Sequence, residues 1–305
     1  MKRLSRKRIV LLILLVGLCI GGWYLFLYEP SYAGLVQQLP SRPLVFAHRG
    51  FGNHAPDNSL AGARIAMERE MDGIDVDGQL SSDGELVIFH DLSVDRLTSA
   101  TGRVSNKTLA ELLALDLGAK FGKGYSGSNV ATFEEFLTAV QGKGIFMVEL
   151  KVPGKEETGI EKRAAEIIAR HDAFESVYLS SFNPFVLYRL KKIDPRIRTV
   201  FIFMDTNWNK ELLAEIKPED AVTLPWFLRQ EWIRRAIRKI IKPDLLSVNF
   251  RVKEKTIDRL LHVGYPIFLW TPNTGEDIRW VLQKQPYGVI SDEPPLAKDL
   301  RDSLP

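Results

Sequence analysis

Short apolar runs alternate with helical patterns along residues 43–305, and this alternation limits the possible folds more than any other feature of the sequence. Strands that are apolar on both faces are typical of a parallel sheet covered by helices. A long unbroken series of strand–helix units favours closure of such a sheet, so we predict an α/β fold with a (β/α)8 barrel. A barrel of this type has eight staves, so one strand-like run lies outside it, and the sequence does not tell which. The nine strand-like runs are 44–48, 73–77, 86–90, 145–150, 177–180, 199–203, 245–249, 266–271 and 288–291.

Residues 9–28 add a second constraint, because these 20 positions contain no charged side chain. A helix of this length is about 30 Å long at roughly 1.5 Å per residue, which matches the hydrocarbon core of a bilayer. Five cations precede the run within the first eight residues, and Glu29 follows it. Positive charge stays in the cytoplasm. We therefore expect a single-pass membrane protein with a cytoplasmic N-terminus and a barrel outside the cytoplasm, in the periplasm if the source is bacterial.

A cleaved signal peptide is the alternative to a retained membrane anchor. The apolar run is long for a signal peptide, and no small-x-small cleavage site follows it, so the sequence favours retention. The expected organisation is a basic tail at 1–8, a transmembrane anchor at 9–28, a linker at 29–42 and a catalytic barrel domain at 43–305.

Charge and cysteine content exclude several classes of protein. Without the five N-terminal cations, residues 9–305 hold 36 Lys and Arg against 38 Asp and Glu, so we expect no nucleic-acid partner. Cys19 is the only cysteine, which excludes a disulfide framework and a cysteine-based zinc site. The sequence does not define an oligomeric state.

Ionisable residues gather at the carboxyl ends of the first four strand-like runs, which a parallel barrel brings to one mouth. Residues two apart on a strand share a face, so Asp75 lies beside Asp77, and Glu149 beside Lys151. Three carboxylates at one mouth are costly without a cation among them, which implies a metal ion. Oxygen ligands select a hard ion, so we expect one divalent cation, Mg²⁺ or Ca²⁺.

Two histidines and an arginine complete the predicted mouth. His48 ends the first run and His90 the third, and a pair of histidines can act as general acid and general base. Arg49 can hold a phosphate through its planar guanidinium, although an ion pair with Asp57 is an equally natural role. These residues indicate metal-dependent hydrolysis of a phosphodiester, and they do not tell which histidine is the acid.

Several longer motifs follow one another along the chain. They are HRG at 48–50, PDNS at 56–59, GIDVDGQLSSDGELVIFHD at 73–91, DRLTSATGRVSNKTLAELLALDLG at 95–118, ATFEEFL at 131–137, VELK at 148–151, SSFNP at 180–184, LWTPN at 269–273 and GVISDEP at 288–294. In these motifs and in their order the chain resembles the glycerophosphodiester phosphodiesterase family. The resemblance implies a TIM barrel that cleaves glycerophosphodiesters to glycerol phosphate and an alcohol.

The resemblance also implies roles for the residues of the mouth, matched position by position. The metal ligands would be Asp75, Asp77 and Glu149. The catalytic histidines would be His48 and His90, although some relatives place the second histidine on the metal.

The family's substrate positions fall on three further residues. Arg49 and Lys151 would contact the phosphate, and Trp270 would wall the glycerol side of the pocket, with barrel packing as the alternative for this tryptophan. Asp57 and Asp75 stand where the family usually has Glu, and each shortens the side chain by one C–C bond, about 1.5 Å.

Two alternatives to glycerophosphodiester cleavage remain open. The same site could act as a lysophospholipase D on membrane lysolipids. The barrel could also bind diesters or lipid without turnover, if the shorter Asp75 does not support the ion. The expected partner is in each case a small-molecule or lipid-derived phosphodiester.

The stretch 229–242 predicts an amphipathic helix with one strongly basic face. The simpler interpretation is an outer barrel helix whose basic side is solvated. The alternative is a helix that lies against anionic lipid headgroups, with Trp226 and Phe227 inserted among them.

Overall fold

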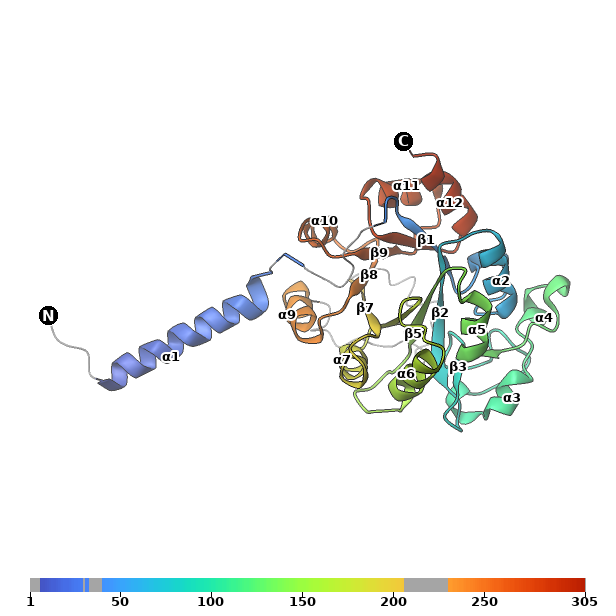
Figure 1. Ribbon diagram of the computed structural model, residues 1–305, viewed down its shortest axis with the longest axis horizontal. Coiled ribbons are helices and arrows are strands. Elements are labelled where there is room, and N and C mark those ends of the chain that lie inside the picture. The colour runs from blue at the N-terminus through green and yellow to red at the C-terminus, as the bar shows by residue number, and fades with distance from the viewer. Residues whose placement is uncertain (1–5, 30, 33–39, 206–229, 305) are drawn as a thin grey trace.

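The computed structural model describes residues 6–29, 31–32, 40–205 and 230–304. Its centre is a closed barrel of eight parallel strands surrounded by helices, so the predicted (β/α)8 TIM barrel is confirmed (Figure 1). The strands neighbour one another in the order β1-β10-β9-β8-β7-β6-β5-β2, and pairing of β1 with β2 closes the ring. The eight staves are β1 (Leu44–His48), β2 (Gly73–Leu80), β5 (Ile145–Leu150), β6 (Val177–Ser181), β7 (Arg198–Phe203), β8 (Leu245–Asn249), β9 (Ile267–Trp270) and β10 (Gly288–Ser291).

The ninth strand-like run is β3 (Leu86–Ile88), which lies outside the barrel. It pairs antiparallel with the end of β2 and with the short strand β4 (Ala131–Thr132). Between β3 and β4 the chain forms an excursion that contains α3 (Leu109–Leu113) and α4 (Gly118–Phe121). The excursion has its own small apolar core, formed by Val87, Phe89, Val94, Val104, Leu112, Leu117 and Val130.

Helices cover the outside of the barrel, and several begin at side-chain caps that the sequence encodes. Thr132 and Glu135 form a capping box at the start of α5, and Ser59 caps α2. The covering helices are α2 (Leu60–Glu68), α5 (Phe133–Val140), α6 (Ile160–Arg170), α7 (Pro184–Ile193), α9 (Glu231–Ile241), α10 (Glu254–His262), α11 (Gly275–Gln283) and α12 (Pro294–Asp302).

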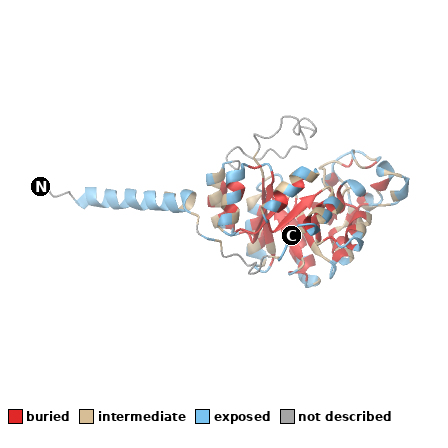
Figure 2. Cartoon of the chain, turned by 90° about the horizontal axis from the view of Figure 1, so that it is seen from above, coloured by how far each residue is buried: buried red, intermediate tan, exposed pale blue. Residues whose placement is uncertain are grey.

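The buried residues lie in two layers, one inside the barrel and one between the strands and the helices (Figure 2). Phe46 and Phe268 fill the inside, with ring centroids 4.6 Å apart. Glycines leave room for these rings, because a Cβ on Gly73 would lie 2.6 Å from Phe46 and one on Gly288 would lie 2.4 Å from Phe268. The barrel interior is therefore packed, and the site must lie at its rim.

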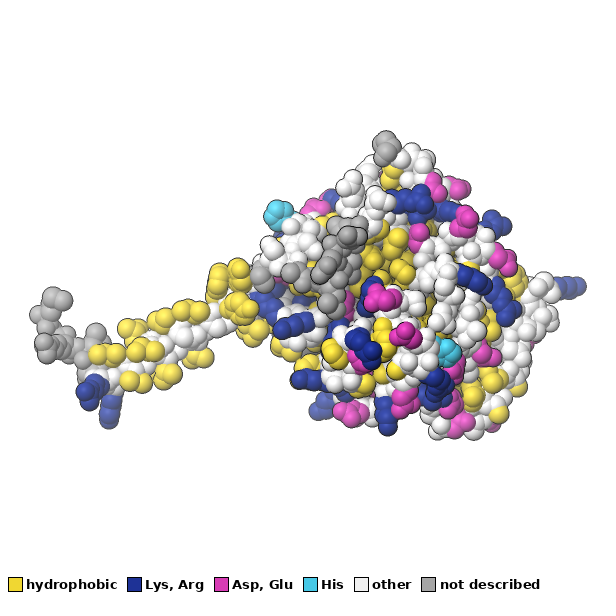
Figure 3. All heavy atoms as spheres, in the orientation of Figure 1, with side chains coloured by type: hydrophobic (Ala, Val, Ile, Leu, Met, Phe, Trp, Pro, Cys, Tyr) yellow, Lys and Arg dark blue, Asp and Glu magenta, His cyan; other side chains and the backbone are white. Residues whose placement is uncertain are grey.

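The N-terminal helix extends away from the barrel beside α9 (Figure 1). It comprises α1 (Arg6–Gly22) and a π-helical segment, Trp23–Leu27, which together make 22 residues. Most of its apolar side chains are exposed (Figure 3), as a membrane span or a signal sequence requires.

Candidate active site

Strand pairing brings four of the predicted site residues to neighbouring positions at the carboxyl ends of three staves. His48 at the end of β1 is in register with Asp75 of β2, and Asp77 of β2 is in register with Glu149 of β5. Asp75 and Asp77 are two residues apart on one strand, so they point to the same side of the sheet. The fold therefore brings together residues that are up to a hundred positions apart in the sequence.

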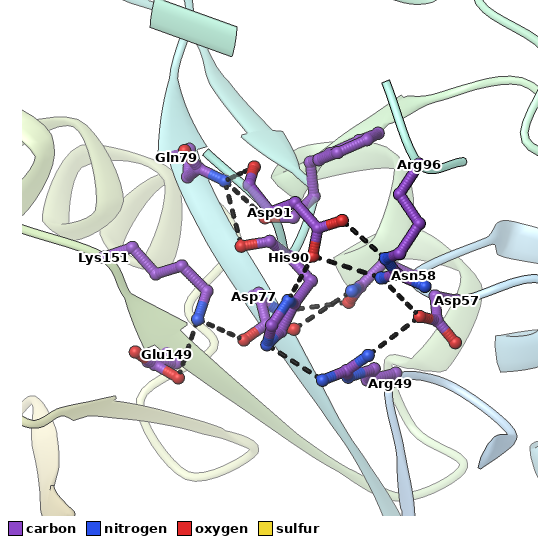
Figure 4. A network of polar contacts seen from close by, with 11 residues as sticks. Arg49, Asp57, Asn58, Asp77, Gln79, His90, Asp91, Arg96, Glu149 and Lys151 are labelled. Carbon is purple, nitrogen blue, oxygen red and sulfur yellow. Dashed lines mark hydrogen bonds and ion pairs between the residues drawn. The ribbon is translucent and has the colours of Figure 1, made fainter. Parts of the chain in front are cut away.

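Lys151 lies between two of the carboxylates (Figure 4). Its Nζ is 3.0 Å from Asp77 Oδ1 and 3.2 Å from Glu149 Oε2. Asn58 holds the other oxygen of Asp77 through an Nδ2–H bond of 3.0 Å, and accepts the backbone N–H of Asp77 at 3.1 Å. Although burial opposes ionisation, Lys151 and these neighbours hold the pKa of Asp77 well below its usual range.

Asp75 has the opposite electrostatic environment. Burial raises its pKa to about 7, with Asp77 and Glu149 adding to the rise and His48 opposing it. The pKa of Glu149 is also raised, first by burial and then by Asp77, against the effect of Lys151. Within the described residues, no three acidic, His or Cys side chains are arranged as a ready metal cage. The three carboxylates, with the Lys151 ammonium beside two of them, nevertheless form an electronegative, all-oxygen donor set, which suits a hard divalent cation.

His48 is held by a carboxylate from the far end of the chain. Its Nδ1 lies 2.6 Å from Asp292 Oδ1. Asn273 fixes Asp292 in turn, because its Nδ2–H donates to Asp292 Oδ2 at 2.7 Å. Burial opposes the charged form of His48, but the hydrogen bond and charge of Asp292 outweigh it, so the pKa of His48 is raised.

His90 lies two residues beyond β3, so it reaches the site from the excursion. The sequence analysis had expected it to come from the end of a barrel strand. Its Nδ1 lies 2.7 Å from Asp91 Oδ1, and its Nε2 lies 3.0 Å from Arg49 Nη2. A guanidinium only donates, so Nε2 accepts this bond and the imidazole is neutral with its proton on Nδ1. Burial, Lys151 and Arg49 lower the pKa of His90 to about 4, against Asp77 and Asp91.

Arg49 forms the ion pair with Asp57 that the sequence analysis left open as an alternative to phosphate binding. Nη1 of Arg49 lies 2.9 Å from Asp57 Oδ2, while its Nε is buried without a hydrogen-bond partner in the described part of the chain. Arg49 has a left-handed backbone (φ 51°), which lets the chain turn sharply after β1. The guanidinium is therefore anchored at one edge and directed toward His90 at the other.

Arg96 belongs to the site, although the sequence analysis did not assign it. Its Nε lies 2.6 Å from Asp91 Oδ2 and its Nη2 lies 2.9 Å from Asp57 Oδ2, so it joins the partners of both His90 and Arg49 (Figure 4). The roles of Asp91, Asp292 and Asn273 were also missed. All of these residues lie within the motifs noted above, but spacing alone does not show which side chain faces which histidine.

Trp270 ends β9 and packs edge-on against Phe182, with ring centroids 5.9 Å apart. It also contacts the inner barrel core. Its Nε1–H is buried and has no hydrogen-bond partner in the described part of the chain. A buried donor without a partner is costly, so this N–H is available to a bound oxygen atom.

The rim of this TIM barrel holds histidines, carboxylates and cations, a combination that suits hydrolysis of a phosphoric diester. Residues 48–296 match the model of the glycerophosphoryl diester phosphodiesterase family. The chain belongs to this family, and the predictions of the family and of enzymatic activity are confirmed.

Individual relatives agree with this assignment. The glycerophosphodiester phosphodiesterase of Caldanaerobacter subterraneus subsp. tengcongensis is 30% identical over 254 residues, which cover 83% of this chain and 95% of that protein. A glycerophosphodiester phosphodiesterase of Bacillus subtilis is 29% identical over 210 residues, covering 64% and 71%.

Solved structures show the same fold. A phosphodiesterase of Oleispira antarctica, in complex with its product sn-glycerol-3-phosphate, superposes with a TM-score of 0.71 at 24% identity, over 86% of this chain and 98% of that one. A glycerophosphodiester phosphodiesterase structure from Galdieria sulphuraria superposes with a TM-score of 0.69 at 21% identity, over 86% and 98%.

Proposed function

We propose that this enzyme cleaves glycerophosphodiesters to glycerol phosphate and an alcohol, with a divalent cation and with His48 and His90 as an acid–base pair. The observation that carries the proposal is the pair of histidines at one rim, each oriented by its own carboxylate, beside the three acidic side chains. The product bound by the Oleispira antarctica phosphodiesterase, sn-glycerol-3-phosphate, supports the substrate class.

Asp75, Asp77 and Glu149 are the residues that would hold Mg²⁺ or Ca²⁺. When bound, the ion would stabilise the negative charge that develops on the phosphate oxygens. The pKa values of Asp75 and Glu149 are raised first by burial and then by neighbouring carboxylates, and a bound cation would offset both effects.

His90 is the proposed base. Its Nε2 carries a lone pair, and its Nδ1–H is held by Asp91, which would stabilise the imidazolium after proton uptake. The nucleophile is water or the glycerol hydroxyl next to the ester. For His90 to accept its proton, Arg49 must release Nε2, and a bound phosphate gives the guanidinium a stronger acceptor.

His48 is the proposed acid. Its Nδ1–H is held by Asp292, so its Nε2–H is the proton that would pass to the leaving alkoxide. Arg49 and Lys151 would contact the phosphate. Trp270 would line the glycerol side of the pocket, and its Nε1–H, which has no partner among the described residues, would donate to a substrate oxygen.

The test is a panel of glycerophosphodiesters with the full-length protein in Mg²⁺, Ca²⁺ or chelator. We expect metal-dependent release of glycerol phosphate and loss of turnover in chelator, restored by adding the ion. Absence of release with either ion, in both the natural protein and Asp75→Glu, would instead support a binding protein without turnover.

A lysophospholipase D activity is the second candidate, favoured by the exposed apolar helix next to the barrel. Comparing lysophosphatidylcholine with glycerophosphocholine as substrates decides between the two activities. A higher kcat/KM for the lysolipid would make the membrane lipid the preferred substrate.

The apolar helix is proposed to be a retained single-pass anchor. Residues 1–8 would lie in the cytoplasm and residues 43–305 outside it, in accord with the positive charge before the span. Protease added to the outside of intact cells or spheroplasts should cleave the chain within residues 43–305, whereas cleavage only after lysis would contradict this topology.

A further inference from the structure

The end of the N-terminal helix is bound by cationic side chains of α9. Lys239 Nζ donates to the carbonyl oxygens of Tyr24, Leu25 and Tyr28, the bond to Leu25 being 3.1 Å long. Arg235 Nη1 donates to the carbonyls of Phe26, at 3.2 Å, and Leu27. The last carbonyls of a helix lack partners within the helix and carry its negative partial charge, so cations stabilise them.

Glu29 inserts into a cluster of arginines directly after the helix. Only 6% of its side chain is exposed, and its carboxylate lies 2.6 Å from Arg238 and 3.2 Å from Arg235, and also pairs with Arg259. Arg238 is completely buried and also pairs with Glu231 at 2.7 Å. Clustered arginines are stable only when carboxylates balance their charge. Glu29 contacts all three arginines and Glu231 contacts Arg238 and Arg259, so the cluster uses both carboxylates.

Aromatic contacts hold the segment on both sides of Glu29. Phe26 packs edge-on against Trp232 of α9, with ring centroids 5.3 Å apart. Tyr32 stacks on Tyr265 at 4.2 Å, and its hydroxyl donates to the carbonyls of Pro243 and Asp244. The part of the predicted 29–42 linker that contains Glu29 and Tyr32 is therefore packed on the barrel.

These contacts change the interpretation of the basic helix. The sequence analysis placed the basic face of 229–242 in solvent or on lipid headgroups. In the structure Arg234 is 1% exposed and bonded to Asp205, while Arg235, Arg238 and Lys239 bind the N-terminal segment. Trp226 and Phe227 lie outside the described residues.

We propose that residues 23–29 and 31–32, together with α9 and α10, form a permanent joint, the anchor joint, which holds the N-terminal span and the barrel in one fixed orientation. The span is then an integral part of the folded protein and not a leader to be removed. The pKa values of Arg235 and Lys239 are lowered first by burial and also by neighbouring arginines, which agrees with a crowded cationic socket.

The anchor joint defines which side of the barrel faces the membrane. In both views the span leaves the barrel from its flank (Figures 1 and 2), and α9 is the helix labelled at this flank in Figure 1. A span that crosses the bilayer therefore places the α9–α10 flank on the membrane surface. The rim with the two histidines then opens along the membrane surface, where lipid-derived diesters diffuse.

The experiment cuts the chain after the N-terminal part of the anchor joint and before the first barrel strand. A protease site is inserted between Ser41 and Arg42, both exposed, in the full-length protein reconstituted in phosphatidylcholine vesicles. After cutting, no covalent bond connects barrel and span. We expect the barrel to sediment with the vesicles, because the joint still holds it. Release of the barrel on cutting would overturn the proposal.

Variants distinguish the joint from direct contact with lipid. Glu29→Lys should lower the sedimenting fraction about tenfold after cutting, because it places a cation against buried arginines. Lys242→Glu is the matched control, since Lys242 is exposed and outside the joint, and it should sediment like the parent. Equal sedimentation of Glu29→Lys and the parent would show that lipid holds the barrel, and would overturn the proposal.

Three further measurements distinguish loss of the joint from loss of the fold. Turnover of a water-soluble glycerophosphodiester before cutting reports whether each variant is folded. If Glu29→Lys is unfolded, Lys239→Gln replaces it. This variant removes bonds to three carbonyls without burying a new charge, so it should release part of the barrel, and full retention would count against the joint. A mature protein that begins after residue 32 would also overturn the proposal.

Discussion

The two histidines of the rim have almost identical carboxylate contacts, but their pKa values are shifted in opposite directions. His48 lies 2.6 Å from Asp292 and His90 lies 2.7 Å from Asp91. The pKa of His48 is raised, whereas that of His90 is lowered to about 4. Burial lowers the pKa of both histidines, but Asp292 outweighs it at His48, whereas Lys151 and Arg49 add to it at His90. A carboxylate partner alone does not decide whether a histidine is an acid or a base.

The residues that hold the two carboxylates in place differ as well. Asp292 is held by the neutral amide of Asn273, while Asp91 is held by the guanidinium of Arg96. Arg96 stabilises the negative charge of Asp91. Asp91 therefore stabilises a protonated histidine less than Asp292 does. Each of the following experiments tests one part of this difference.

Removing either histidine should have the largest effect. We expect His48→Ala and His90→Ala each to lower kcat by about 10² to 10⁴, the usual contribution of a general acid or base. A nitrophenyl diester, whose leaving group needs no proton, should restore turnover to the His48 variant only. His54→Ala, whose histidine pairs with Glu293, serves as the control. Equal rescue of both variants would remove the proposed division of roles.

Replacing the carboxylates should affect the pH profile unequally. The raised pKa of His48 keeps its proton available, and activity that needs this proton falls as the pH rises through that pKa. Asp292→Asn removes the cause of the rise, so the alkaline limb of kcat/KM should move to lower pH, with a loss of about 10- to 100-fold in rate. Asp91→Asn should leave the alkaline limb in place. A shift of this limb in both variants would contradict the assignment of His48 as the acid.

Arg96→Gln should lower kcat/KM about tenfold, as expected for loss of a charge-assisted contact. The expected cause is misplacement of Asp91 and Asp57, because Arg96 contacts both. The thermal midpoint should change little, since the side chain is about half exposed. Arg103→Gln in the same excursion is the matched control. A tenfold loss in that variant too would indicate a general effect of charge.

Asn273→Ala should have the smallest effect, about threefold in kcat, because it removes a neutral amide from Asp292. It should also move the alkaline limb in the same direction as Asp292→Asn, but less. An effect larger than that of Arg96→Gln would show that the amide is the more important support. Steady-state rates across pH measure both quantities.

The barrel was predictable because each stave carries its own apolar pattern. The identity of the run outside the barrel was not, because Leu86, Val87 and Ile88 are as apolar as any stave. They are buried too, although partly in the excursion's own core. Only strand pairing, which a single sequence does not contain, separates the two cases.

The site was predictable to the extent that strand ends define it. His48, Asp75, Asp77 and Glu149 meet because register places them side by side. The partners that tune the histidines come from loops, where local pattern does not specify direction, and Asp292 is 244 positions from His48. The basic face of α9 shows the same limit, because its amphipathic period does not reveal that residues 24–29 bind to it.

The separate apolar core of the excursion has a consequence for inactivation. His90, Asp91 and Arg96 are mounted on this module, whose core is far smaller than that of the barrel. Small cooperative units open at lower free energy than the whole protein. On heating, His90, its carboxylate and its supporting arginine should leave the site together while the eight staves stay closed. Catalysis and global unfolding would then have different midpoints, and hydrogen exchange in residues 86–130 would follow the first of them.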